Sequence, residues 1–118
     1  MGKNFLNKES ILSCPDLTTQ AVDVPEWGGQ VLIQSMTAAQ REFFEISVTN
    51  AAESEKTKGL RALLVSLSVV DDQGKYLFSH ADLQALSEKS ANAMDRLVAE
   101  IQKLNKLSAK EVETAEGN

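Results

Sequence analysis

The chain has 118 residues, of which 42% are apolar, and its formal net charge is −5. This length fits one domain, 1–118, and the acidic balance argues against nucleic-acid binding, which depends on clustered Lys and Arg. No apolar run approaches the ~20 residues that span a bilayer, and the single cysteine, Cys14, allows no internal disulfide. We therefore expect a soluble intracellular protein that binds neither nucleic acid nor membrane, with 1–8 and 114–118 flexible.

The N-terminal third of the sequence predicts one helical turn and then a β-hairpin. The stretch "NKESILSCP" can form the turn, which Pro15 stops. After it "LTTQAVDV" alternates with a period of two, and "QVLIQS" resumes as a strand. Between them, Pro25 fixes φ and Gly28–Gly29 permit positive φ, so the hairpin is expected over 17–35. A lone hairpin is marginal in water, and it must therefore lie on the helices that follow.

The region 37–112 is predicted to be helical. Thr37 and Gln40 form a capping box that opens a helix through "REFFEISV". The polar stretch 50–59 is expected to be a loop or a frayed turn. The next stretch, "LRALLVSLSVV", is apolar nearly all round at helical spacing, which predicts a buried helix. A strand also fits 63–70, because short apolar runs are ambiguous.

Further helix signals follow Gly74, which suits a left-handed helix stop. Ser79 and Asp82 form a box-like pair that opens a short helix. Ser87 is predicted to cap the next helix, and a final capping box lies at 108–111. The apolar stripe of the long helix consists of Ala91, Met94, Leu97, Val98, Ile101 and Leu104. The predicted fold class is α+β and mainly α-helical: a small bundle of about four to five helices with one N-terminal β-hairpin.

Reactive side chains are few in this sequence. His80 is the only histidine, and no histidine lies near Cys14, so a catalytic triad or a metal site lacks its partners. Glu42 and Glu45 fall on a helix surface, where a solvated face explains them better than a glycosidase-type pair. The segment "DDQG" lacks the first ligand of a calcium loop. We therefore expect no catalytic residue, no metal, no cofactor and no enzymatic activity.

Aromatic side chains are the candidates for partner binding. Trp27 stands on the hairpin turn; its indole either folds back over the hairpin–helix junction, which is favoured, or stands exposed as an anchor. Phe43 and Phe44 are adjacent and point about 100° apart on a helix. One of them is expected in the core, while the other can reach the hairpin or a partner. The predicted partner-binding set is Trp27, Phe43, Phe44, Tyr76 and Phe78.

The order of these features resembles the tail assembly chaperones of long-tailed bacteriophages, the lambda-like and related siphophage group. The resemblance covers about 17–118. It is carried by "VDVPEWGGQVLIQSMTAAQREFFE", by "VVDDQGKYLF" followed by "DLQALSEKSANAMDRL", and by "LNKLSAKEVETAE". It implies a non-enzymatic protein that binds and solubilises the tape measure protein during tail morphogenesis, by covering its apolar helices and by self-association.

The resemblance also implies where and with whom such a protein works. It acts in the host cell cytoplasm, forms a homo-oligomer or an open helical array, and is absent from the mature virion. A longer form made by translational frameshifting would contact the tail tube protein, and the present chain would be the short form. The alternative is a structural head–tail connector or neck component, which would remain in purified virions.

Overall fold

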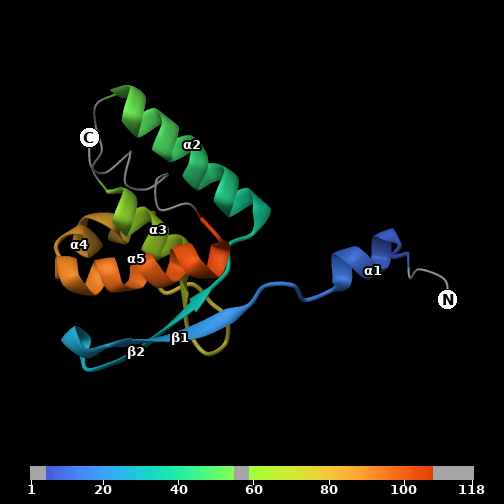
Figure 1. Cartoon of the computed structure of the whole chain (residues 1–118), viewed down its shortest axis with the longest axis horizontal. Helices are drawn as coiled ribbons and strands as arrows, with labels where there is room; N and C mark the ends of the chain where they lie inside the picture. Colours follow the sequence, from blue (N-terminus) through green and yellow to red (C-terminus); the bar gives the residue numbers. More distant parts are fainter. Residues whose placement is uncertain (1–4, 55–58, 108–118) are drawn as a thin grey trace.

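A three-stranded sheet and a stack of helices make up the fold, shown in Figure 1 as a computed structural model that describes residues 5–54 and 59–107. Helix α5 (Ala91–Asn105) lies on the sheet, α3 (Leu60–Ser68) packs on α5, and α2 (Ala38–Ser54) packs on α3. In Figure 1, α2 is therefore on the side of the molecule away from the sheet. The predicted class, α+β and mainly α-helical with an N-terminal hairpin, is confirmed.

The predicted hairpin consists of β1 (Thr19–Val24) and β2 (Gly29–Gln34), which pair antiparallel along their whole length. A 3₁₀ turn, η1 (Pro25–Trp27), joins them and ends at Gly28, whose φ of +73° is one that glycine adopts without strain. The period-two pattern is borne out, because alternate side chains of β1 enter the core. The buried residues of β1 are Val22 and Val24.

A third strand divides the apolar run that the sequence left ambiguous. Helix α3 ends at Ser68, and β3 (Val69–Val70) then pairs antiparallel with Leu32 and Ile33 of β2. Only the last two residues of 63–70 are therefore extended, and the expectation of one helix through the whole run is corrected. Val69 and Val70 are β-branched, and such residues favour strands. Here they pair with the edge of β2 that β1 does not occupy.

Helix α2 begins as predicted and ends later than predicted. The Thr37 N–H donates to Gln40 Oε1 (2.9 Å) and the Gln40 N–H donates to Thr37 Oγ1 (3.1 Å), which is the expected capping box. The helix then runs through the first half of 50–59, which the sequence assigned to a loop. Ala51 explains the extra turn, because it is buried beside Leu60 of α3.

Two short helical elements precede α5, and the predicted N-cap of α5 is wrong. The predicted capping box at Ser79 opens η2 (His80–Asp82), which continues directly into α4 (Leu83–Ser87). The Ser87 hydroxyl donates to the carbonyl of Leu83 (2.9 Å) and does not cap α5. Ser90 is the N-cap instead, since its side chain accepts from the backbone of α5. An N-cap residue immediately precedes the first helical residue. Because α5 begins at Ala91 and not directly after Ser87, Ser90 takes this position.

Hydrogen bonds to its own aspartate hold the "DDQG" turn. Asp71 accepts hydrogen bonds at Oδ1 from the N–H groups of Gln73 (2.8 Å) and Lys75 (2.9 Å). Gly74 has the positive φ that was predicted, +82°, but it lies in the turn after β3 and does not end a helix, because α3 already ends at Ser68. The predicted capping box at 108–111 lies outside the described residues, as do 114–118 and the first half of 1–8.

The N-terminal helix, α1 (Lys8–Ser13), is the predicted helical turn. Its N-cap is Asn7, whose Oδ1 accepts from the N–H of Ser10 (2.9 Å). None of its residues is buried. Figure 1 shows α1 beyond the start of β1, well away from the helices that cover the sheet.

The core forms around α5, which is covered by the sheet on one side and by α3 on the other. Most of its predicted stripe is buried, but Ala91 is exposed and Leu104 only partly buried, while Ala93 lies in the core. Helix α2 contributes Phe44 to the same cluster. The largest fully buried side chains are Phe44, Ile33, Leu64, Leu97 and Ile101.

One buried polar group in the described part of the chain lacks a partner, and it generates a prediction. Ser68 is fully buried at the end of α3, and its hydroxyl makes no hydrogen bond there. A buried unsatisfied hydroxyl costs free energy, so Ser68→Ala should raise the free energy of unfolding by about 1 kcal/mol in urea denaturation. Ser66→Ala is the matched control, because that hydroxyl donates to the Leu63 carbonyl (2.8 Å) and its loss should destabilise. A drop in stability for Ser68→Ala would contradict this account.

Candidate functional site

Reactive groups do not converge in the described residues. His80 is exposed in the first turn of η2, as predicted, and Cys14 is exposed at the end of α1. Across 5–54 and 59–107, no three His, Cys, Asp or Glu side chains lie where they could share a metal ion. The helices in that part of the chain are too short or too polar to cross a bilayer. Glu42 and Glu45 are exposed on α2, where Glu45 pairs with Arg41 (3.3 Å), which fits the predicted solvated face.

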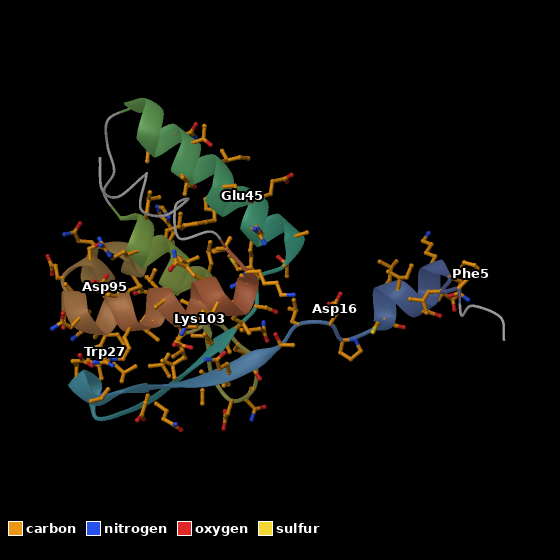
Figure 2. All side chains as sticks on the ribbon, in the orientation of Figure 1. Phe5, Asp16, Trp27, Glu45, Asp95 and Lys103 are labelled. Carbon is orange, nitrogen blue, oxygen red and sulfur yellow. The ribbon has the colours of Figure 1, made fainter. Side chains whose placement is uncertain are left out.

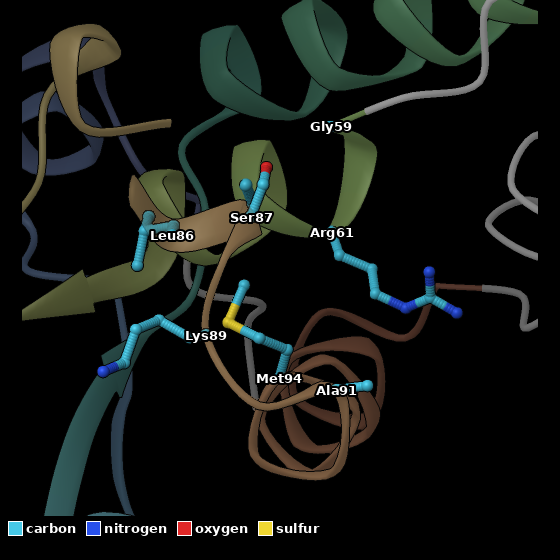
Figure 3. Close-up of a pocket in the computed structure, with 8 residues that line it drawn as sticks. Gly59, Arg61, Leu86, Ser87, Lys89, Ala91 and Met94 are labelled. Carbon is cyan, nitrogen blue, oxygen red and sulfur yellow. The ribbon is translucent and has the colours of Figure 1, made fainter. Parts of the chain in front are cut away.

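A pocket of about 250 Å³ lies between α3, α4 and the start of α5 (Figure 3). Its two cationic side chains, Arg61 and Lys89, point in opposite directions in Figure 3. The Arg61 guanidinium donates to Asp95 of α5 (2.8 Å), so it serves to join the two helices. The remaining lining residues are Gly59, Ala62, Leu86, Ser87, Ala91 and Met94. The Ser87 hydroxyl donates to the Leu83 carbonyl (2.9 Å) rather than to a side-chain base.

The two adjacent phenylalanines of α2 divide as predicted. Phe44 is fully buried in the core, so it has no surface with which to contact a partner. Phe43 is 53% exposed, and Ile46, three residues later, is 54% exposed. Residues at i and i+3 lie on the same side of a helix. Phe43 and Ile46 therefore form an apolar patch on the outer side of α2, which we call the α2 stripe.

Trp27 combines the two arrangements that the sequence allowed. It is partly buried and packs against the core cluster below the start of α5, and Figure 2 shows it at the turn end of the hairpin. Together with Phe78 it separates two hollows of about 390 and 460 Å³. We call this concave surface the Trp27 groove; its apolar walls are Trp27, Val31, Leu32, Val70, Leu77 and Phe78.

Tyr76 lies apart from the other aromatic candidates. It is 42% exposed and forms an isolated bridge with Val70, next to the sheet. Its hydroxyl oxygen lies 3.4 Å from the Gln34 amide nitrogen, which donates to it. The predicted partner-binding set is thus spread over four places: Phe44 in the core, Trp27 and Phe78 in the Trp27 groove, Phe43 on α2 and Tyr76 beside the sheet.

The N-terminal segment, which is not in the predicted partner-binding set, carries much of the exposed apolar surface. Phe5 is 85% exposed and Leu12 is 75% exposed, and Figure 2 shows Phe5 far from the body of the molecule. We call residues 5–17 the N-terminal arm. Five large apolar side chains are exposed on it: Phe5, Leu6, Ile11, Leu12 and Leu17. The signal was visible in "NFLNKESIL", where paired apolar residues interrupt a polar stretch.

A bidentate ion pair holds the hairpin turn to α5. Arg96 donates to both carboxylate oxygens of Glu26, from Nε (3.2 Å) and Nη2 (3.0 Å). The hydrogen bond from Arg96 keeps the pKa of Glu26 below its ordinary value. Further along the same helix, the Gln20 amide donates to Glu100 (2.8 Å), and this bond lowers the pKa of Glu100. These contacts fix the position of β1, and of the turn that carries Trp27, relative to α5.

The half-buried position of Trp27 predicts a measurable loss of stability on its removal. Trp27→Ala should lower the free energy of unfolding by about 2–3 kcal/mol, somewhat less than a fully buried aromatic residue would cost. Denaturation followed by circular dichroism measures this without relying on tryptophan emission. An unchanged free energy of unfolding would mean that the indole does not support the core.

The Glu26–Arg96 pair predicts a pH dependence with a defined sign. A carboxylate whose pKa is lowered in the folded state adds stability above its ordinary pKa and loses it as the pH falls through the lowered value. In Arg96→Met, the pKa of Glu26 measured by NMR should rise toward its ordinary value. The stability difference from wild type should then be present at neutral pH and absent in acid. Arg61→Met is the control and should leave the pKa of Glu26 as it is in the wild type. A Glu26 pKa that does not move in Arg96→Met would refute the pairing.

Comparisons with known proteins point to one fold. No protein-family model matches the sequence, and no curated protein matches it either. Among solved structures, the chain is similar to the tail assembly chaperone of bacteriophage HK97, with a TM-score of 0.60 and 15% sequence identity. The alignment covers 81% of this chain and 90% of that one. The chain therefore has the fold of a phage tail assembly chaperone, as the resemblance in its sequence predicted.

Proposed function

We propose that this chain is a phage tail assembly chaperone that binds the tape measure protein and keeps it soluble during tail morphogenesis. The observation that carries the proposal is the fold shared with the HK97 tail assembly chaperone over most of both chains. The scattered reactive groups agree with a role in binding rather than turnover, since catalysis needs convergent groups. The protein would act by covering apolar surface.

The α2 stripe is the surface that we assign to the tape measure protein. Phe43 and Ile46 face away from the core at one-turn spacing, and a long client helix with an apolar face can pack along such a row. Glu42 and Glu45 are exposed on the same helix. Their charge would help to keep the free chaperone from aggregating through the stripe.

A long client requires many copies of a chain this small. We infer that the chaperone self-associates, as a homo-oligomer or an open array, along the tape measure protein in the host cytoplasm. Head-to-tail contacts that do not close generate such arrays. The chaperone would leave before the virion is complete, and a longer frameshifted form would contact the tail tube protein. A virion that retains the chain would instead favour the head–tail connector role.

The proposed function predicts that the α2 stripe is needed for client solubility. When the tape measure protein of the same phage is co-expressed with the wild-type chain, it should be soluble and co-purify with it. The double variant Phe43→Ser/Ile46→Ser should weaken this binding by about 30-fold, the effect of losing an aromatic hot spot. Its melting temperature should be nearly unchanged, because both side chains are exposed.

Tyr76→Ser is the control, since it also removes an exposed aromatic ring but from the sheet side. It should leave the client soluble. Loss of solubility with Tyr76→Ser alone would move the client site to the sheet. A tape measure protein that stays insoluble beside the wild-type chain, or the chain found in purified virions, would overturn the proposed function.

A further inference from the structure

The N-terminal arm exposes apolar surface that no other residue in 5–54 or 59–107 covers. It carries five of the nine large apolar side chains that are exposed in the described residues. Helix α1 is nevertheless formed, with Asn7 as a regular N-cap and with Ser13 Oγ donating to the Glu9 carbonyl (2.8 Å). An ordered segment with this much exposed apolar surface is typical of an interaction site.

The Trp27 groove is a concave apolar surface on the same molecule. Its two hollows, of about 390 and 460 Å³, meet at the Trp27–Phe78 pair. The larger hollow also has Leu86 and Ala85 in its wall. The groove is open because β3 pairs only with Leu32 and Ile33; in the described part of the chain, no strand covers the other end of β2 on that side.

We propose that the N-terminal arm of one copy docks in the Trp27 groove of a second copy. The arm presents two apolar pairs, one at Phe5–Leu6 and one at Ile11–Leu12, and the groove presents two apolar hollows. Lys8 and Glu9 lie between the two pairs, and the larger hollow has Lys89 in its lining, which can pair with Glu9. Asp72 and Asp82 lie on the lining of the groove, where their carboxylates can pair with Lys8.

Chain geometry favours a second copy over the arm's own groove. The arm joins the body at the start of β1, whereas Trp27 follows the end of β1, about 20 Å away at ~3.3 Å per residue. The five residues 14–18 reach at most about 17 Å when fully extended. To reach its own groove the arm would have to fold back along β1, whereas Figure 2 shows Phe5 and Trp27 at opposite ends of the molecule. A second copy can accept the arm as it is folded.

This contact deepens the proposed function, on which its biological role rests. An arm and a groove are different surfaces, so the contact runs head to tail and can extend into a chain of copies. The arm has 13 residues, fewer than the 20–30 per side of a standard stable interface. Association is therefore expected to be weak and concentration-dependent until a client gathers several copies. Helix α2, which carries the α2 stripe, lies on the side of the molecule away from the hairpin (Figure 1), so docking of the arm leaves it free.

The first test measures self-association of the purified full chain without any client. Sedimentation over a concentration series should show the mass of the wild type rising with concentration. The arm variant Ile11→Asp/Leu12→Asp and the groove variant Leu77→Asp should both remain monomeric at tenfold higher concentration. Both sites are exposed, so the melting temperatures should be unchanged. The control Phe43→Ser/Ile46→Ser should associate like the wild type. Monomeric wild type, or association that survives the arm variant, would overturn the proposal.

The second test uses the single tryptophan and the single cysteine, which lie in the groove and at the end of α1. A Trp27→Phe chain carrying an energy acceptor on Cys14 is mixed with unlabelled wild type. Emission from Trp27 should fall in the mixture and recover when the labelled chain also carries Ile11→Asp/Leu12→Asp. Quenching that occurs only when donor and acceptor share one chain would place the arm in its own groove and refute exchange between copies.

These measurements separate the inference from the proposed function. If arm exchange occurs but the tape measure protein stays insoluble, the contact stands and the chaperone role fails. If the client becomes soluble with the wild type and also with the arm variant, the chaperone role stands. Docking of the N-terminal arm in a second copy is then not the contact that assembles the copies along the client.

Discussion

The fold depends on the burial of the apolar face of α5 from two sides at once. A β-hairpin alone is marginal in water, and a nine-residue helix such as α3 is too short to persist by itself. Both become stable by packing on α5, whose Leu97 and Ile101 are fully buried between them. The second buried cluster in the described residues consists of Ala51 and Leu60 alone, so it is too small to replace this contact.

The ends of α5 determine how the outer elements are oriented. At its C-terminal end, Asn105 Oδ1 accepts from the N–H of Met36 (2.8 Å), and its carbonyl accepts from Arg41 (3.0 Å). These bonds place the start of α2, so that Phe44 turns inward and the α2 stripe turns outward. Toward the other end, Arg96 holds the hairpin turn through Glu26. The same helix therefore positions both surfaces that we assign to partners.

The distribution of apolar surface gives the molecule three separate places for contacts. Helix α2, which carries the α2 stripe, lies away from the sheet (Figure 1). Trp27 of the groove and Phe5 of the arm lie at opposite ends of the molecule (Figure 2). A protein that coats a long client needs one surface for the client and two for its neighbours along the coat. Separation of the three allows all of these contacts in one assembly, and the acidic charge limits indiscriminate association.

Local interactions let the sequence alone determine the capping boxes at Thr37 and Ser79, the hairpin turn with Gly28 and the stripe of α5, because each involves residues only a few positions apart. Tertiary packing decided the rest. The run after Leu60 becomes a strand at Val69 because β2 offers an edge there, and α2 gains a turn because Ala51 meets α3. Contacts between elements also decided that Phe44, and not the adjacent Phe43, is buried. The same kind of contact brings Trp27 and Phe78 together across 50 residues of chain, and no local pattern encodes either result.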